Sequence, residues 1–204
     1  MILIGQYDSP FVRRVAIALR LYEMPFEHRP WSVFRDAARV GEVNPLGRVP
    51  ALVLDDGEVL IDSAAILDHL DEQAGPARAL IARSGPARRR ALHLCALASG
   101  AAEKAVALVY ERATHTTVSP VLTARLHGQI AATLAALDAE AAPLAGAPIG
   151  HAAIMLACAL RFTAESSPSL LPPGRYPTLD AHAARCEALP VFAEIAQPFD
   201  GPRG

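Results

Sequence analysis

The chain has 204 residues, with 21 acidic and 19 basic side chains and a net charge of -2, a length that suits one large domain or two small ones. The mildly acidic balance and scattered basic residues argue against nucleic-acid binding. No apolar run approaches the ~18 residues of a membrane span, and the N-terminus lacks the pattern of a signal peptide, so we expect a cytoplasmic protein.

The chain begins with a short apolar run that predicts a buried strand within residues 1–6. Apolar residues then recur at helical spacing from about residue 10 to Leu21. Pro10 suits the first helical position, because its missing N–H would have no partner there. Ser9 then falls at the N-cap, where its oxygen can accept a hydrogen bond from a free backbone N–H.

The next segments predict the rest of a small sheet. Residues 26–32 have strand composition, but Pro30 restricts them to an edge. A short helix is expected within 34–43. Residues 44–63 hold two short apolar strands around an Asp-Gly pair, which favours a hairpin, and a helix follows over 64–73.

Beyond residue 75 the pattern becomes helical throughout. Gly and Pro at both ends of 75–87 indicate a linker. The predicted helices cover 86–112, 119–142, 151–163, 177–188 and 190–197. We therefore divide the chain into a first domain (1–76), a linker (77–86) and an all-helical domain (87–204).

Three motifs in this order resemble the glutathione transferases, specifically their bacterial serine-type members. They are YDSPFVRRV (7–15), NPLGRVPAL (44–52) and IDSAAILDHL (61–70). The resemblance covers essentially the whole chain and implies a thioredoxin-like α/β N-terminal domain followed by an all-α C-terminal domain. It also implies an enzyme that binds glutathione as co-substrate, uses no metal and transfers the glutathione thiolate to a small electrophile.

The resemblance implies that Ser9 is the catalytic residue. A free thiol has a pKa of about 8.5, so little of it is thiolate at neutral pH. A hydroxyl that donates to the sulfur, with helical N–H groups behind it, favours the anion. Tyr7 is the alternative, since other classes of the family use a tyrosine near the end of the first strand.

The same resemblance supplies the glutathione-binding residues. The Val49-Pro50 bond resembles a cis-proline loop in which the Val49 backbone pairs with the cysteine of glutathione. Ser63, at a helix N-terminus, would hold the γ-glutamyl carboxylate, and Asp62 would help to balance the ammonium group. The glycine carboxylate has three candidate partners, of which we favour the first: Arg48, Arg35 and Arg39.

Several other polar residues receive structural interpretations. Arg13 is predicted to be an ion-pair partner on the helix surface, and the histidines to lie at surfaces or helix ends. Tyr110 and His115 are weaker candidates for the second-substrate pocket. The helix near residue 151 lacks the family's capping box, because Gly150 and Ala153 occupy its positions, which predicts a local loss of roughly 1 kcal/mol.

Three other functions stay open. A glutathione-dependent isomerase would use the same thiolate, although the Ser-Ser-Cys signature of that class is absent. Thiol-disulfide or peroxide chemistry is disfavoured because residue 9 is not Cys. The chain could also be a non-catalytic interaction protein, because fold alone does not fix function.

The resemblance also implies a homodimer. The two copies would meet through the third helix of the first domain and the first helix of the second. The expected contacts are Ala64, Ala65, Leu92 and the arginines at 88–90. The three cysteines, Cys95, Cys158 and Cys186, show no C-x-x-C or metal-ligand spacing and are expected to be free thiols.

Overall fold

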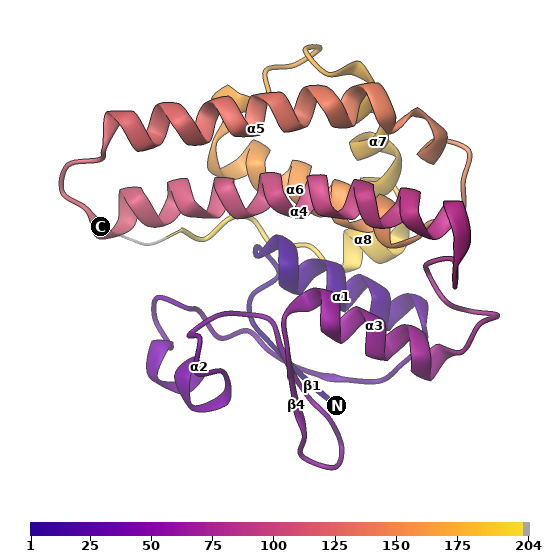
Figure 1. Cartoon of the computed structure of the whole chain (residues 1–204). Coiled ribbons are helices and arrows are strands. Elements are labelled where there is room, and N and C mark those ends of the chain that lie inside the picture. Colours follow the sequence, from indigo (N-terminus) through magenta and orange to yellow (C-terminus); the bar gives the residue numbers. More distant parts are fainter. Residues whose placement is uncertain (202–204) are drawn as a thin grey trace.

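The computed structural model describes residues 1–201, so the last three residues of the predicted helical domain, 202–204, lie outside it. The N-terminal part is a four-stranded sheet with helices, and the C-terminal part is helical (Figure 1). The fold class predicted from the sequence is therefore confirmed. Residues 75–84, between the two parts, contain no helix or strand. The boundaries at 76 and 87 stay a prediction.

The sheet has the order β2-β1-β3-β4. Strand β1 (Ile2–Ile4) pairs in parallel with β2 (Glu27–Arg29) and antiparallel with β3 (Ala51–Val53), which pairs antiparallel with β4 (Val59–Ile61). The β2 strand lies at an edge, as Pro30 predicts.

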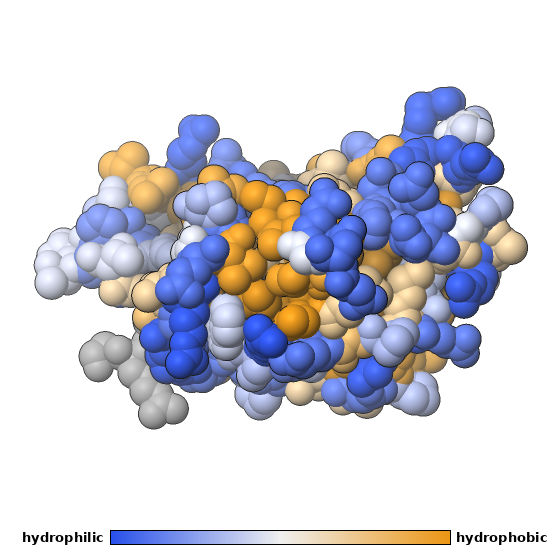
Figure 2. All heavy atoms as spheres, turned by 90° about the horizontal axis from the view of Figure 1, so that it is seen from below, coloured by the Kyte–Doolittle hydropathy of each residue, from blue (hydrophilic) through white to orange (hydrophobic). Residues whose placement is uncertain are grey.

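Two helices lie between the sheet and the C-terminal helices (Figure 1): α1 (Pro10–Leu21) and α3 (Ser63–Ala74). A third, α2 (Ala37–Val43), lies to one side. Seen from below, the molecule has hydrophobic residues gathered near the middle of its face, with hydrophilic residues around them (Figure 2).

Up to residue 201, where the described chain ends, the C-terminal part consists of five α-helices and two 3-10 turns. The helices are α4 (Gly85–Thr114), α5 (Pro120–Glu140), α6 (His151–Ser166), α7 (Pro177–Glu187) and α8 (Pro190–Glu194), and the turns are η1 (Ala142–Leu144) and η2 (Pro168–Leu170). The buried helix predicted at 151–163 is α6, which packs against α1, α4 and α7. Its residues belong to two hydrophobic clusters, one helical and one that includes the sheet and α1. Helix α6 therefore joins the two parts of the molecule.

Helix α4 is, by length and composition alone, apolar enough to cross a membrane. The expectation that no segment approaches a membrane span was therefore wrong by that criterion. The reason is the alanine content of the helix, which raises its hydropathy although Glu103 and Lys104 interrupt it. The helix packs along α5 and α6, as the core helix of a helical bundle does.

The prediction that Arg13 lies on the helix surface was wrong. Its side chain is 2% exposed, and it donates to both carboxylate oxygens of Glu187, at 2.6 and 2.8 Å. It also donates to the carbonyl oxygens of Ile195 and Phe192. Burial disfavours the charged guanidinium, but the bonds with Glu187 outweigh it and raise the pKa of Arg13. These hydrogen bonds therefore connect α1 to the C-terminal helices.

His151 is the first residue of α6, so its predicted place at a helix end is confirmed. The residue is buried, and its Nε2 lies 2.7 Å from an Asp71 carboxylate oxygen. The same carboxylate accepts from the Leu80 amide and from the Tyr22 hydroxyl. The His151 amide donates to the Leu80 carbonyl at 3.0 Å. These bonds satisfy polar groups at the helix start that the missing capping box would otherwise leave unpaired.

Gly150 is required at this position by close approach of the backbone. A Cβ at Gly150 would lie 2.6 Å from the Leu80 carbonyl oxygen. Glycine in place of a capping-box residue therefore lets the segment between α3 and α4 pass close to the start of α6.

Candidate functional site

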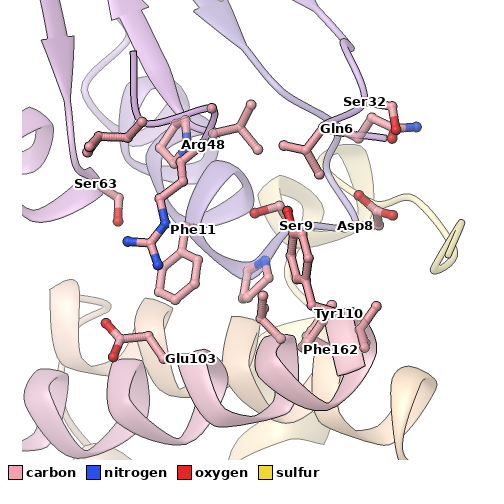
Figure 3. A pocket seen from close by; sticks show the side chains of 18 of the residues that line it. Gln6, Asp8, Ser9, Phe11, Ser32, Arg48, Ser63, Glu103, Tyr110 and Phe162 are labelled. Atoms are coloured by element: carbon pink, nitrogen blue, oxygen red, sulfur yellow. The ribbon is translucent and has the colours of Figure 1, made fainter. Parts of the chain in front are cut away.

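A cleft of about 650 Å³ lies between the N-terminal domain and the helical region. This volume is in the usual range for small-molecule sites. Asp8, Ser9 and Ser63 approach it from the N-terminal domain, and Glu103, Tyr110 and Phe162 from the helices opposite (Figure 3).

Ser9 lies at the N-terminus of α1 and lines this cleft. Its backbone is extended and its Oγ accepts from the Val12 amide at 3.4 Å, so the prediction that Ser9 caps the helix is confirmed. A ligand sulfur at this position would face a hydroxyl and the positive end of a twelve-residue helix.

Tyr7, the alternative to Ser9, is absent from the described lining of the cleft. Its ring stacks on His28, with centroids 3.9 Å apart and planes 2° from parallel. Burial raises the pKa of the Tyr7 phenol. The geometry therefore favours Ser9 as the residue that meets a ligand.

The loop 44–50 forms another part of the cleft wall, and its Val49-Pro50 bond is cis, as expected. Asn44, 1% exposed, holds the loop: its amide nitrogen donates to the Arg48 carbonyl at 2.8 Å. Gly5 allows the chain after β1 to approach Val49 closely, because a Cβ at Gly5 would lie 2.8 Å from the Val49 Cβ. These contacts fix the Val49 backbone at the edge of the cleft.

The start of α3 places Asp62 and Ser63 side by side in the lining. Asp62 caps the helix by accepting from the Ala64 amide at 2.7 Å, and its φ of 66° is unusual for a residue other than glycine. Ser63 is 4% exposed and its Oγ accepts from Arg14 Nη2 at 2.6 Å.

Of the three arginines predicted for a carboxylate, only Arg48 lines the cleft (Figure 3). Arg35 instead pairs with Asp200 at 2.6 Å. Arg39 is 65% exposed and lies 3.7 Å from Asp36. The structure therefore favours Arg48, the preferred candidate.

The helical side of the cleft is largely apolar and aromatic, although Glu103 of α4 also points into it (Figure 3). Its rings come from Tyr110 on α4, Phe162 on α6 and Phe199 near the C-terminus, and Phe11 reaches the cleft from α1. Phe34 meets Tyr110 across the cleft with ring centroids 5.1 Å apart. Burial raises the pKa of the Tyr110 phenol. His115 is not among the described lining residues, so only Tyr110 of the two weaker candidates reaches the site.

Four charged residues of the described lining were missed by the sequence analysis: Asp8, Arg14, Glu103 and Asp200. Burial raises the pKa of the Asp8 carboxyl, which accepts from the Asp200 amide at 3.1 Å. Arg14 follows Pro10 and Phe11 by one helical turn, so helical spacing could have placed it on the same face. No comparable local pattern brings Asp200 to the site.

Comparison with known proteins supports this description. Residues 3–78 match the family model described as "Glutathione S-transferase, N-terminal domain". Among curated proteins, the chain is 34% identical over 113 residues to the uncharacterized GST-like protein YibF of Escherichia coli K12. It is 41% identical over 88 residues to maleylacetoacetate isomerase of Pseudomonas aeruginosa. The first match spans 55% of both chains and the second spans 41% of both chains. The chain therefore spans about half the length of these curated relatives.

Solved structures match over nearly the full length. A glutathione transferase family member from Pseudomonas fluorescens Pf-5, solved with bound glutathione, is 33% identical with a TM-score of 0.87. The similarity covers 97% of this chain and 99% of that one. A glutathione S-transferase from Methylobacillus flagellatus KT, also with glutathione bound, is 25% identical with a TM-score of 0.88, over 97% and 99% of the two chains. With its fold, its cleft and a full-length relative in agreement, the chain belongs to the glutathione transferase family.

Proposed function

We propose that this protein is a glutathione transferase that activates the glutathione thiol at Ser9 and conjugates it to a small, apolar electrophile. The observation that carries the proposal is the division of one cleft between a polar and an aromatic wall. Ser9, the Val49 backbone and Ser63 line it from the N-terminal part of the chain, and Tyr110 and Phe162 line it from the helices opposite (Figure 3).

Each part of glutathione has a matching group on the polar wall. The thiol would meet the Ser9 hydroxyl, and the cysteine backbone would pair with Val49 beside the cis-Pro50. Ser63 would take the γ-glutamyl carboxylate and Asp62 would balance the ammonium group. Arg48 would face the glycine carboxylate. Relatives solved with bound glutathione support the binding of glutathione by this chain.

Ser9 would act by stabilising an anion rather than as a nucleophile. One hydrogen bond to a charged group contributes about 1.5–3 kcal/mol, which corresponds to a thiol pKa lowered by about one to two units. The sulfur of the co-substrate then attacks the electrophile.

Isomerisation is the second candidate, because the chain matches part of a maleylacetoacetate isomerase. Conjugation is favoured by the helical side of the cleft, where the aromatic rings of Tyr110 and Phe162 suit an apolar electrophile. Glu103, which points into the cleft from this side, is acidic and would repel a dicarboxylate substrate (Figure 3).

The proposal includes a cytoplasmic homodimer that takes part in detoxification. All three cysteines are free, which suits a reducing compartment.

Ala64 and Ala65 on α3 are exposed, as is Leu92 on α4, which is 47% exposed. Arg88 of α4 lies 3.7 Å from Asp68 of α3, so the two helices present one continuous surface. Light scattering at micromolar concentration is expected to give the mass of two chains, and a monomer mass would contradict the homodimer.

The function is tested by calorimetry with glutathione followed by a panel of electrophiles. We expect saturable binding and conjugation of aryl halides or epoxides, with a cis–trans dicarboxylate isomerised poorly or not at all. Absence of heat and of thermal stabilisation at millimolar glutathione would support a non-catalytic interaction protein. Efficient isomerisation without conjugation would support the second candidate.

A further inference from the structure

The turn that brings Ser9 to the cleft is held by the opposite end of the chain. The Ser9 amide donates to the Gln6 carbonyl at 3.2 Å, which closes the turn. Its two central residues, Tyr7 and Asp8, both form hydrogen bonds with the segment 197–200. That segment follows α8 and contains no helix or strand.

Each of the two hydrogen bonds fixes one central residue of the turn. The Tyr7 amide donates to Gln197 Oε1 at 3.2 Å, and Asp8 Oδ2 accepts from the Asp200 amide at 3.1 Å. The C-terminal segment passes beside Asp8, next to Ser9 (Figure 3). One bond is donated by the turn and the other by the segment, so the turn is held at two points.

The segment 197–200 is itself fixed on two further sides. Arg35, which precedes α2, pairs with the Asp200 carboxylate at 2.6 Å. Glu165 of α6 accepts from the Phe199 amide at 2.7 Å. The segment therefore has a defined place in the molecule, against which the turn is held.

The position of the turn matters because the helix cap alone orients Ser9 weakly. The bond from the Val12 amide to Ser9 Oγ is 3.4 Å long, whereas N–H···O bonds are usually at most about 3.2 Å. A donor stabilises an anion well only when it is already held at the place where the charge will lie. The backbone of the turn therefore decides how well the Ser9 hydroxyl meets a sulfur.

We infer that Gln197 and Asp8 are positioning residues for thiol activation: they hold the turn that places the Ser9 hydroxyl at the glutathione sulfur. This inference rests on the proposed function, since it concerns the same thiol. Both residues act through Ser9, which remains the catalytic residue.

The test is a pH titration of thiolate absorbance in the glutathione complex of Gln197→Leu. Leucine removes the acceptor of the Tyr7 amide, so the pKa of the bound thiol should rise by at least about half a unit, a part of the one to two units expected from Ser9. Gln197→Glu keeps an acceptor and should recover most of this change. Glutathione affinity should stay within about 3-fold in both variants, because other residues bind the peptide.

A double-mutant cycle separates an effect through Ser9 from a general effect on the fold. In the Ser9→Ala background, Gln197→Leu should leave the thiol pKa unchanged, because the hydroxyl that it positions is already absent. Glu194→Gln is the matched control, since Glu194 forms an exposed ion pair with Arg20 of α1 at 2.9 Å rather than a hydrogen bond to the turn. It should change neither the thiol pKa nor turnover.

Asp8 gives a second, independent pair of variants. Asp8→Ala removes the acceptor of the Asp200 amide and should raise the thiol pKa as Gln197→Leu does. Asp8→Asn keeps an acceptor oxygen and removes a negative charge near the sulfur, so the thiol pKa should stay at or below the wild-type value.

A wild-type thiol pKa in Gln197→Leu would overturn the inference, and so would an equal rise in the wild-type and Ser9→Ala backgrounds. If Gln197→Leu does not fold, the two Asp8 variants decide: equal thiol pKa values in Asp8→Ala and the wild type would overturn the inference. Failure of the proposed function is distinct, because the wild type itself would then bind no glutathione thiol to titrate.

Discussion

The two walls of the cleft are built in different ways. The polar wall comes from short local patterns: a helix cap at Ser9, an X-Pro loop at Val49 and a second cap at Asp62. The aromatic side chains of the cleft come from positions far apart in the chain, such as Phe34 and Tyr110, whose ring centroids lie 5.1 Å apart. Under the proposed function, recognition of glutathione would therefore depend on local backbone geometry, whereas the electrophile would meet a surface that tertiary packing creates.

The largest expected effect on stability comes from removing the ion pair between Arg13 of α1 and Glu187 of α7. Arg13→Met should lower the free energy of unfolding by about 3 kcal/mol, the lower end for a broken buried pair, because Glu187 keeps its contact with Arg161. Denaturant unfolding measures this change. Arg161→Met is the control and should cost less than about 1 kcal/mol, because this side chain is partly exposed. Equal effects of the two substitutions would contradict the role given to Arg13.

The close approach at Gly150 gives the next largest effect. Gly150→Ala should destabilise the protein by about 1–3 kcal/mol, because the added Cβ would meet the Leu80 carbonyl. The matched control is Gly128→Ala in α5, where a Cβ would contact nothing within 4 Å. That substitution should stabilise the protein slightly, since alanine is the better helix former. A Gly150→Ala variant as stable as the wild type would refute this packing.

Ser9→Ala addresses the polar wall directly. Loss of the cap should cost about 1 kcal/mol of stability. Turnover near neutral pH should fall about 10-fold or more if the hydroxyl also stabilises the thiolate, while glutathione affinity changes little. Steady-state kinetics and calorimetry separate the two effects. Unchanged turnover would leave capping as the only role of Ser9, and Tyr7→Phe would then be the variant to examine.

The contact between α3 and α6 that Asp71 makes with His151 should weaken in acid. Burial opposes ionisation of this carboxyl, but the hydrogen bonds from His151 and Tyr22 lower its pKa below the ordinary value of 3.8. The stabilisation from these bonds is present above the ordinary value and is lost as the pH falls through the lowered one. Unfolding measured from pH 5 to pH 2 should show a steeper acid loss for the wild type than for Asp71→Asn. Identical slopes would show that Asp71 does not contribute.

The smallest effect on glutathione is expected from the aromatic wall. Tyr110→Phe should leave glutathione affinity within about 2-fold, since the residue lies opposite the proposed peptide site. It should instead change the ratio of kcat/KM between polar and apolar electrophiles, because it removes a hydroxyl group from the lining of the cleft. A large loss of glutathione affinity would show that the two walls do not divide the substrates as proposed.

The sequence predicted the order of elements and the local parts of the site well, because each depends on neighbouring residues. The cap at Ser9, the edge position of β2 and the hairpin follow from helix periodicity, Pro30 and Asp-Gly. Arg13 was misplaced because a charged residue on a helix is usually exposed. Its burial depends on Glu187, 174 positions away, and no local pattern signals that partner. The same limit applies to Phe199 and Asp200, which reach the cleft from near the C-terminus.

The measurement that most directly tests the central claim is a pH titration of thiolate absorbance in the complex with glutathione. The account predicts a bound thiol pKa about one to two units below the free value of about 8.5, and a return toward that value in Ser9→Ala. A wild-type complex whose thiol titrates at or above the free value would contradict the account.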